Sequence, residues 1–328
     1  MYTSKLDLLE TEKAIKIIKD TFQGYLSKKM VRVSAPKFIR MGTGIQDDLA
    51  GTCSSVQFYV PNLSQNLEIV HSLAKWKRLA LSRYKIPCGQ GLYTDMDAIR
   101  KDEVLDEIHS IYVDQWDWEI HISENQRNLS FLKEIVNHIY DYIYQTKKYL
   151  VSLYPQLTMD LPKNITFIHS ENLYQLYPFL DSKEREAKVC QKFGAVFLIG
   201  IGYPLLDGKP HDTRANDYDD WSTETSPDIH GLNGDILVWD AVRQDAIELS
   251  SMGIRVNKES LITQMKEPLQ EYHHLILEGK IPQSIGGGIG QSRLCQFLLE
   301  KKHIGEVQVS EWTPEIYEQC AKEGILLL

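Results

Sequence analysis

The stretch that most restricts how this chain can fold is Ser-Ile-Gly-Gly-Gly-Ile-Gly-Gln-Ser-Arg-Leu, from Ser284 to Leu294. Glycine weakens a strand, so a run of glycines indicates that a flat ligand or a phosphate comes close to bare backbone. Apolar residues Leu294, Phe297 and Leu298 have helical spacing, which predicts a helix directly after the glycines. Arg293 lies at that junction, where a guanidinium can stack on an aromatic base or neutralise a phosphate.

The glycine stretch matches neither of two common phosphate-binding motifs. No Gly-Lys-Ser or Gly-Lys-Thr follows it, as a P-loop requires. No acidic residue follows at the distance that a dinucleotide-binding turn needs. Taken alone, these residues are also compatible with a flexible glycine turn before a helix.

The composition is that of a globular protein in a reducing compartment. The 328 residues carry a formal net charge of −9, which opposes binding along a nucleic-acid backbone. The 5 cysteines form no Cys-x-x-Cys pair, so neither a disulfide framework nor a zinc knuckle is expected. No signal region and no run of ~20 apolar residues is visible. We therefore expect a cytoplasmic protein with no nucleic-acid or membrane partner, and one domain over residues 1–328.

Hydrophobic periodicity predicts a mixture of helices and strands. Helices are expected at residues 4–29, 124–152, 181–193 and 258–277. Another helix is expected to start within residues 71–78, with Ser72 as a possible N-cap. Strands are expected at residues 31–36, 56–60, 67–70, 108–120, 165–168, 195–201, 234–240 and 246–256, and residues 91–103 are expected to be a strand that leads into a charged turn. Pro36 cannot donate to a ladder, so strand 31–36 should lie at a sheet edge.

The strand at residues 108–120 alternates with a period of two. One face carries Ile111, Val113, Gln115, Asp117 and Glu119, and the other carries Tyr112, Asp114, Trp116 and Trp118. Carboxylates and an amide among strand-forming residues favour a floor that faces a ligand over a wet edge strand.

Two neighbouring strands carry carboxylates that could hold a metal ion. If residues 241–244 form a hairpin turn, Asp235 lies roughly opposite residues 248–250. Glu248 and Ser250 should share a face, because they are two residues apart. Asp235 and Glu248 would then suit Mg²⁺ bridged by phosphates, although two carboxylates on a solvated edge would have the same pattern.

Three further segments indicate charged ligands. Lys75, Lys77 and Arg78 form a basic first helical turn, which has the wrong sign for the helix dipole and hints at an anionic ligand; a solvated basic face is the alternative. Residues 42–51 form a glycine-bounded loop with two adjacent carboxylates, either a solvated turn or a cation-binding loop. Residues 207–228 lack any period, and their aromatic side chains favour a lid over a disordered linker.

Three motifs together resemble the signatures of the class II aminoacyl-tRNA synthetase catalytic fold. Gly286-x-Gly288-x-Gly290-x-x-Arg293 is similar to the third signature and Arg100-x-x-Glu103 to the second, in which arginine holds the ATP α-phosphate. Pro36, after the first helix and strand, is similar to the first, dimer-forming signature. The resemblance implies an α+β catalytic domain with a mainly antiparallel sheet flanked by helices, and a homodimer through the Pro36 region.

Five more segments resemble the ammonia-dependent asparagine synthetase A family, nearly end to end. They are His71–Arg78, Tyr112–Glu119, Tyr218–Ser222, Gly231–Trp239 and Glu248–Arg255. The resemblance implies conversion of L-aspartate, ATP and ammonia to L-asparagine, AMP and pyrophosphate through a β-aspartyl-adenylate. Gln291 and Ser292 depart from the parent synthetases, which usually carry a hydrophobic and an acidic residue there.

The resemblance also implies roles for particular residues. The expected catalytic residues are Arg100, Gln115 and Asp47, and the expected aspartate-binding residues are Ser72, Lys77, Asp117, Asp219 and Ser251. The expected ATP-binding residues are Arg100, Glu103, Arg214, Glu248, Ser250, Gly288, Gly290 and Arg293. Mg²⁺ is expected on Asp235 and Glu248, and Asp219 or Asp220 is a candidate for binding the incoming ammonium.

The nitrogen donor can be argued from cysteine positions. Glutamine-using amidotransferases need a cysteine nucleophile, but residue 2 is Tyr2 and no Gly-x-Cys-x-Gly elbow is present. Free ammonia is therefore the expected donor. An aspartyl- or asparaginyl-tRNA synthetase type of adenylating enzyme is the alternative, opposed by the charge and by the lack of a visible anticodon-binding segment. A non-catalytic relative is the third possibility.

Overall fold

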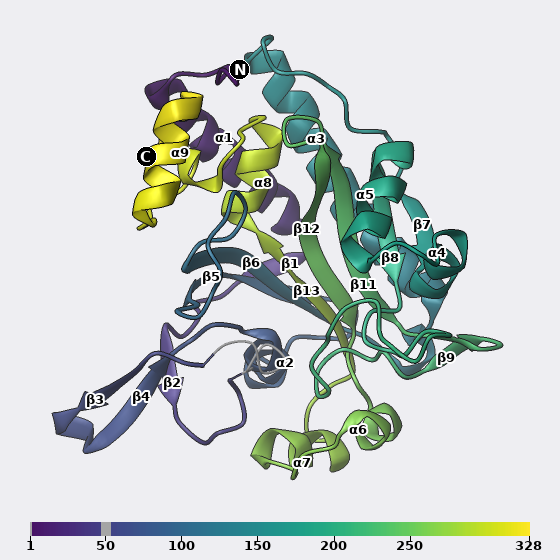
Figure 1. Cartoon of the computed structure of the whole chain (residues 1–328). Coiled ribbons are helices and arrows are strands. Elements are labelled where there is room, and N and C mark those ends of the chain that lie inside the picture. Colours follow the sequence, from purple (N-terminus) through teal and green to yellow (C-terminus); the bar gives the residue numbers. More distant parts are fainter. Residues whose placement is uncertain (1, 47–53) are drawn as a thin grey trace.

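One large sheet forms the centre of the protein, whose computed structural model describes residues 2–46 and 54–328 (Figure 1). In spatial order its strands are β1 (Met30–Arg32), β5 (Gly91–Ile99), β6 (Tyr112–His121), β13 (Ser284–Gly290), β12 (Asp245–Ile254), β11 (Asn233–Asp240), β8 (Ala195–Ile199) and β7 (Thr166–His169). Neighbours from β5 to β8 are antiparallel, whereas β1 and β7 pair in parallel at the two edges. The predicted mainly antiparallel sheet is confirmed, and so is the edge position of the strand before Pro36.

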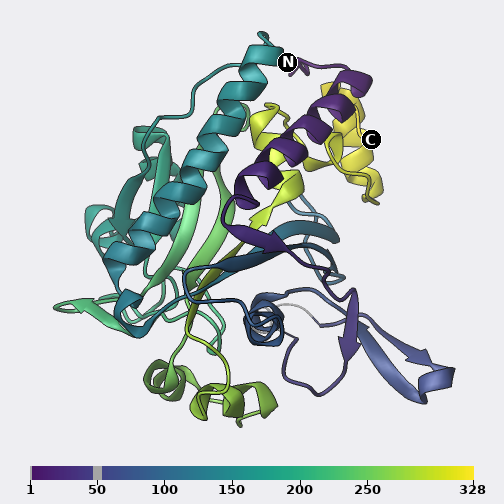
Figure 2. The same cartoon turned by 180° about the vertical axis from the view of Figure 1, so that it is seen from behind.

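Helices cover the two faces of the sheet unequally. The long helices α1 (Leu8–Leu26) and α3 (Leu129–Leu153) lie side by side across one face, where α8 (Gln291–Leu298) also packs (Figure 2). On that face Phe22 stacks on Trp116 with 4.8 Å between ring centroids. On the other face α2 (Ala74–Arg83) packs on β5, β6 and β13, and α5 (Ser182–Phe193) packs on β8, β11 and β12. The middle of this second face is left for a cavity.

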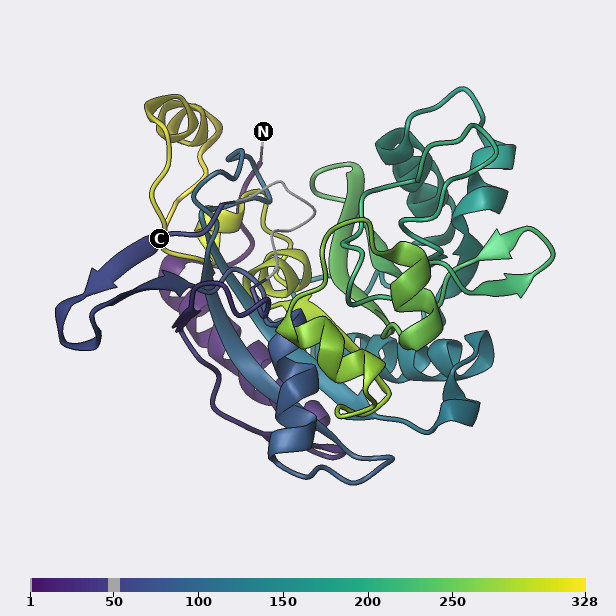
Figure 3. The same ribbon diagram turned by 90° about the horizontal axis from the view of Figure 1, so that it is seen from below.

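Smaller elements extend from this body. β2 (Phe38–Arg40), β4 (Gln65–Ile69) and β3 (Gln57–Val60) form a three-stranded sheet that projects away from the large one (Figures 1 and 3). The remaining elements are α4 (Ser170–Leu176), β9 (Glu224–Ser226), β10 (Ile229–His230), α6 (Lys258–Gln264), α7 (Glu271–Leu277) and α9 (Pro314–Glu323). Short 3₁₀ turns lie at η1 (Pro61–Leu63), η2 (Glu124–Gln126) and η3 (Ile304–Glu306). Among the described residues, no helix is both long and apolar enough to cross a membrane.

Three predicted boundaries were wrong for local reasons. The helix expected at residues 258–277 is broken into α6 and α7, because Pro268 removes a donor and biases the residue before it toward extended backbone. The first helix begins only at Leu8, after the capping residue Asp7. The N-cap of α2 is Leu73 rather than Ser72, although the Ser72 hydroxyl does accept a hydrogen bond of 3.2 Å from the Ala74 amide.

Candidate active site

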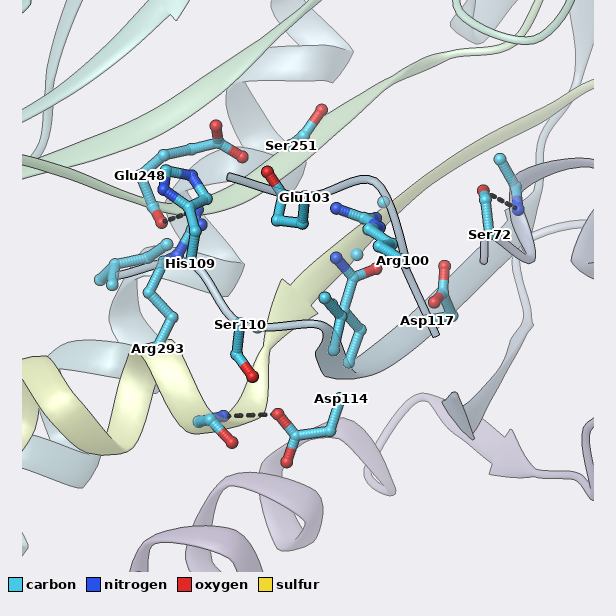
Figure 4. Close-up of a pocket in the computed structure, with 18 of the residues that line it drawn as sticks. Ser72, Arg100, Glu103, His109, Ser110, Asp114, Asp117, Glu248, Ser251 and Arg293 are labelled. Carbon is cyan, nitrogen blue, oxygen red and sulfur yellow. Dashed lines mark hydrogen bonds between the residues drawn. The ribbon is translucent and has the colours of Figure 1, made fainter. Parts of the chain in front are cut away.

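A cavity of ≈ 350 Å³ opens on the sheet face between α2 and α5, and it brings most of the predicted site residues together. Its lining includes the predicted residues Ser72, Lys77, Arg100, Glu103, Gln115, Asp117, Arg214, Asp219, Glu248, Ser251, Gly288, Gly290 and Arg293. In Figure 4, Arg293, His109 and Glu248 lie toward one end, and Ser72 and Asp117 lie toward the other. Asp235 and Ser250 are not part of the lining, and Asp47 falls outside the residues that the structure describes.

Strand β6 forms part of the cavity wall, as its alternation predicts. Gln115 and Asp117 line the cavity, while the Trp116 and Trp118 side chains are fully buried in the core on the opposite face. Asp117 accepts a hydrogen bond of 2.5 Å from the Lys77 ammonium, which also donates to the Gly287 carbonyl at 2.7 Å. Burial lowers the pKa of Lys77 from its ordinary value, although Asp117 opposes that effect. Lys77 and Asp117 therefore form a buried ion pair at the floor of the cavity.

The glycine run makes room for neighbouring side chains. Gly286 pairs with Glu119 and Gly288 with Asp117 across β13 and β6. A Cβ atom on Gly286 would lie 1.7 Å from the Glu119 carboxylate, and one on Gly288 would lie 2.5 Å from the Gln115 amide oxygen. Because these two glycines have no side chain, Glu119 and Gln115 of β6 can lie over the backbone of β13. The sequence had suggested a ligand or a phosphate as the reason for the bare backbone, and the described contacts supply a different one.

Arg255 is a cavity residue that the sequence argument did not single out. Its guanidinium binds the Glu119 carboxylate with distances of 2.9–3.2 Å, contacts Asp219 on its other side, and lies over the Tyr218 ring. Burial alone would lower the pKa of Arg255, but Glu119 and Asp219 outweigh it and raise that pKa. No local pattern marks this residue, because it follows directly after β12 and its partners Glu119 and Asp219 lie far away in the sequence.

The hairpin of β11 and β12 contains a β-bulge that changes which side chains face the cavity. Asp235 pairs with Ser251, but beyond the bulge Leu237 pairs with Glu248, so Leu249 is the extra residue. Glu248 and Ser251 therefore line the cavity together, and the predicted sharing of a face by Glu248 and Ser250 was wrong. The Ser250 hydroxyl instead donates to the Gly288 carbonyl at 2.9 Å.

Arg214 contacts Asp235, one of the two carboxylates that were predicted to hold a metal ion. It donates to Ser251 at 2.6 Å and to one oxygen of Asp235 at 2.5 Å. Burial raises the pKa of Asp235 to about 7, with Arg214 opposing and Glu248 reinforcing the shift. Within the described chain, the Glu248 carboxylate makes no hydrogen bond, and no cluster of three or more metal-binding side chains occurs.

The donor set nevertheless fits a magnesium ion shared with phosphates. Two carboxylates on adjacent strands repel each other, and a divalent cation would relieve that repulsion. Mg²⁺ commonly binds through one or two carboxylates, with phosphate oxygens and water completing its shell. Binding to both oxygens of Asp235 would require the Arg214 guanidinium to move.

The end of the cavity near Glu248 carries Arg293 and His109, and Arg100 lies between this end and Ser72. Arg293 donates to the carbonyls of Glu248 and Ile108 at 3.2 and 3.3 Å, and burial lowers its pKa. Arg100 donates a long hydrogen bond of 3.4 Å to the His71 carbonyl. His109, which the sequence argument missed, donates through Nδ1 to the Asp106 carboxylate at 2.8 Å, so its Nε2 stays available to a ligand.

The loop predicted to be a lid forms a wall of the cavity held by many contacts. Arg214, Ala215, Tyr218 and Asp219 line the cavity, and Asp219 is 1% exposed. Asp220 does not line it: its carboxylate accepts hydrogen bonds from Arg127 and Thr223. The suggestion that Asp220 could bind ammonium is therefore not supported by its position.

Solved structures with the same architecture define the class of fold. An asparaginyl-tRNA synthetase from Entamoeba histolytica in complex with asparaginyl-adenylate aligns with a TM-score of 0.68 and 13% identity, covering 92% of this chain and 66% of that one. The corresponding enzyme from Pyrococcus horikoshii, complexed with asparaginyl-adenylate, aligns with a TM-score of 0.69 and 14% identity, covering 93% and 69%. This chain thus has the catalytic fold of class II aminoacyl-tRNA synthetases, and it spans about two thirds of their length.

Sequence comparisons identify the family within that class. A model of the AsnA, aspartate–ammonia ligase, family matches residues 9–324. Aspartate–ammonia ligases from Bacteroides fragilis and Clostridium perfringens are each 52% identical over 336 residues, covering 100% of this chain and 97% of each relative. The one from Malacoplasma penetrans is 50% identical over 332 residues, covering 98% and 99%. The chain belongs to the aspartate–ammonia ligase family.

The contact between Gly286 and Glu119 gives a first prediction. Replacing Gly286 with alanine should displace Glu119 from Arg255, because the new methyl group would overlap the carboxylate. We expect a lower melting temperature, equivalent to about 3 kcal/mol or more of lost stability, since breaking a buried ion pair is costly. Differential scanning calorimetry measures this. The control is Gly24→Ala in α1, where nothing lies within 4 Å of the added Cβ; equal melting temperatures for both variants would contradict the assignment.

Proposed function

We propose that this chain is an ATP-dependent ligase that converts L-aspartate and ammonia to L-asparagine, releasing AMP and pyrophosphate. The observation that carries the proposal is a single cavity lined by Arg293 and Glu248 at one end and by Ser72 and Asp117 at the other, with Arg100 between them. Such a cavity can hold a nucleotide and an amino acid side by side. The names of relatives at 50–52% identity over nearly the whole chain point to the same reaction.

The chemical problem is that a carboxylate is a poor electrophile. In the proposed reaction, an oxygen of the β-carboxylate attacks the α-phosphorus of ATP, and pyrophosphate departs. Ammonia then attacks the β-carbonyl carbon of the adenylate, AMP departs with the bonding electrons, and one proton is released. Two anions must first be brought together, so positioning and fixed positive charge supply the catalysis, with no covalent enzyme intermediate.

At the amino-acid end, opposite charges are arranged to bind a zwitterion. Asp117 and Gln115 are proposed partners of the α-ammonium group, and Lys77, with the neighbouring guanidinium of Arg255, is proposed to bind the α-carboxylate. The Lys77–Asp117 ion pair supports this assignment. When a zwitterion binds, Lys77 can pair with its carboxylate and Asp117 with its ammonium group. Ser72, Ser251 and Asp219 are proposed to complete the pocket, and Asp47 remains a proposed member.

At the nucleotide end, the proposed ligands of ATP are the arginines Arg100, Arg293 and Arg214, the carboxylates Glu103 and Glu248, and the backbone at Gly288 and Gly290. Arg100 would bind the α-phosphate, where charge develops as the bond to pyrophosphate breaks. Arg293 would lie against the base, since its guanidinium is already fixed by two carbonyls. Ser250 is left out of this set of ligands. It does not line the cavity, and its hydroxyl donates to the Gly288 carbonyl.

Mg²⁺ is proposed on Asp235 and Glu248, where it would neutralise phosphate charge when bound. The chain's own contribution is to hold the two carboxylates on adjacent strands, next to Arg214. We further propose that the protein acts in the cytoplasm. The described cysteines Cys88, Cys190, Cys295 and Cys320 are free, which supports a reducing compartment.

The competing activity is transfer of the adenylated amino acid to tRNA, as the names of the fold neighbours indicate for those proteins. Their identity of 13–15% to this chain carries the fold alone. The family match favours the ligase, and the net charge of −9 supports the proposal that no nucleic acid takes part.

A product assay tests the function directly. RNase-treated enzyme is incubated with ATP, Mg²⁺, ammonium and aspartate labelled with ¹⁸O in its β-carboxylate. We expect asparagine and AMP in equal amounts, with one ¹⁸O atom in AMP, because the β-carboxylate oxygen becomes the bridge to phosphorus. Chromatography and mass spectrometry measure both. Asparagine that forms only when tRNA is added, or label found in ADP or phosphate, would refute the proposal; glutamine in place of ammonium is the donor control.

The metal assignment gives a separate prediction. Asp235→Asn and Glu248→Gln should each weaken Mn²⁺ binding in the presence of ATP by about tenfold or more, since each removes one anionic ligand. Electron paramagnetic resonance of free Mn²⁺ measures the affinity. Asp245→Asn is the matched control, because Asp245 is exposed on the same hairpin. If both variants bind Mn²⁺ as tightly as Asp245→Asn does, then Asp235 and Glu248 do not hold the metal ion.

We also propose a homodimer across the edge strand β1, close to Pro36. The open edge of the large sheet supports it, as does Val31, which is 55% exposed there. Sedimentation velocity at micromolar concentration should give a dimer. Val31→Asp should shift it toward monomer, because a charge would be buried at the contact, whereas Val309→Asp, exposed on the chain between η3 and α9, should not. A wild-type monomer at this concentration would contradict the proposal.

A further inference from the structure

Helices α6 and α7 take no part in the chemistry proposed above, although the chain enters them directly from β12 and leaves them into β13. They project below the sheet in Figure 1. Their apolar residues Leu261, Tyr272 and Ile276 pack together with Leu79 of α2. Two polar side chains of these helices, Gln264 and His273, contact the loop that forms one wall of the cavity.

Gln264, the last residue of α6, binds the second half of the loop through both the nitrogen and the oxygen of its side-chain amide. Its side-chain amide donates to the carbonyls of Asn216 and Asp219 at 3.1 and 2.9 Å. Its amide oxygen accepts from the backbone amide of Trp221 at 3.0 Å and from the hydroxyl of Ser222 at 2.9 Å. The side chain is fully buried, so these contacts use every part of one amide without competition from water.

A second anchor lies on α7. His273 shares a hydrogen bond of 3.0 Å with Asp217 of the loop, and its other ring nitrogen accepts from the Gln270 amide at 2.9 Å. This arrangement makes the Nε2–H of His273 the donor to Asp217. Asp217 also pairs with Lys75 of α2 at 2.5 Å, so the loop is joined to the helix that carries Lys77. Asp217 thus connects three elements outside the cavity.

The loop needs such anchors because no helix or strand covers residues 207–223. Backbone pairing fixes part of it, since Asp219 forms an isolated bridge with Arg255 and the Asp220 amide donates to the Ile254 carbonyl at 2.9 Å. Side-chain contacts from neighbouring elements add to this pairing. Between and beside the anchored residues, the loop presents Arg214 to Asp235 and Ser251, and presents Asp219 to Arg255. A displacement of about 1 Å in such groups is enough to reduce a positioned reaction severely.

We propose that Gln264 and His273 are positioning residues, which hold Asp219 in place and thereby set how well the amino-acid end of the cavity binds aspartate. This inference rests on the function proposed above. Neither residue lines the cavity, so each acts through the loop and not by touching substrate.

The first test compares Gln264→Ala with Thr263→Ala, its neighbour on α6, whose hydroxyl binds only the Glu259 carbonyl. We expect Gln264→Ala to raise KM for aspartate by about tenfold or more, and to raise it more than KM for ATP, because several loop contacts are lost together. Hydrogen exchange without substrates should become faster in peptides covering residues 212–222 and stay unchanged in β5 and β6. Thr263→Ala should match wild type in both measurements.

A second pair of variants covers the case in which Gln264→Ala does not fold. His273→Ala should raise KM for aspartate and quicken loop exchange, while His273→Gln, which keeps a donor for Asp217, should lie closer to wild type. Wild-type KM and loop exchange in Gln264→Ala or His273→Ala, or faster exchange spread evenly over the protein, would overturn the proposal. Absence of aspartate-dependent AMP formation by the wild-type enzyme would refute the proposed function, whereas loop exchange would still report on the anchors.

Discussion

Strand β6 carries opposite chemistry on its two faces, and both the core and the cavity depend on that alternation. Trp116 and Trp118 are buried against the long helices, with Phe22 stacked on Trp116. One residue along, Asp117 and Glu119 point to the other face and meet Lys77 and Arg255. A shift of register by one residue would bury the carboxylates among apolar side chains, so the apolar packing of one face fixes the position of the charges on the other.

The charges on the cavity side are held in alternating order. Glu119 and Asp219 flank Arg255, and Asp219 and Asp235 flank Arg214. Desolvating such groups is costly, and each one is stabilised only while its partners stay in place. The network therefore contributes little net stability but fixes the orientation of each guanidinium before any substrate arrives. Fixed charge of this kind is the usual means by which an active site stabilises charge that develops during a reaction.

The sequence predicted the sheet, its alternation and most of the cavity lining, because these follow from local pattern and from motifs with fixed spacing. It did not predict the bulge at Leu249, since a single extra residue in a strand leaves no mark on composition. It also missed Arg255, His109 and the contact of Arg214 with Asp235. These contacts depend on where a loop crosses the sheet. Their partners lie far apart in the sequence, so no short stretch of sequence predicts them.

The position of the cations bears on which carboxylate of aspartate would react. If Lys77 and Arg255 bind the α-carboxylate, that group is held beside Asp117 and Asp219, the ion-pair partners of these two cations. The side-chain carboxylate is then the one directed toward the nucleotide end, since the two carboxylates of aspartate lie at opposite ends of a short chain. A synthetase must present the α-carboxylate to the same phosphate. Under the proposed site, the difference between the two reactions within one fold would lie in which end of the amino acid the buried cations bind.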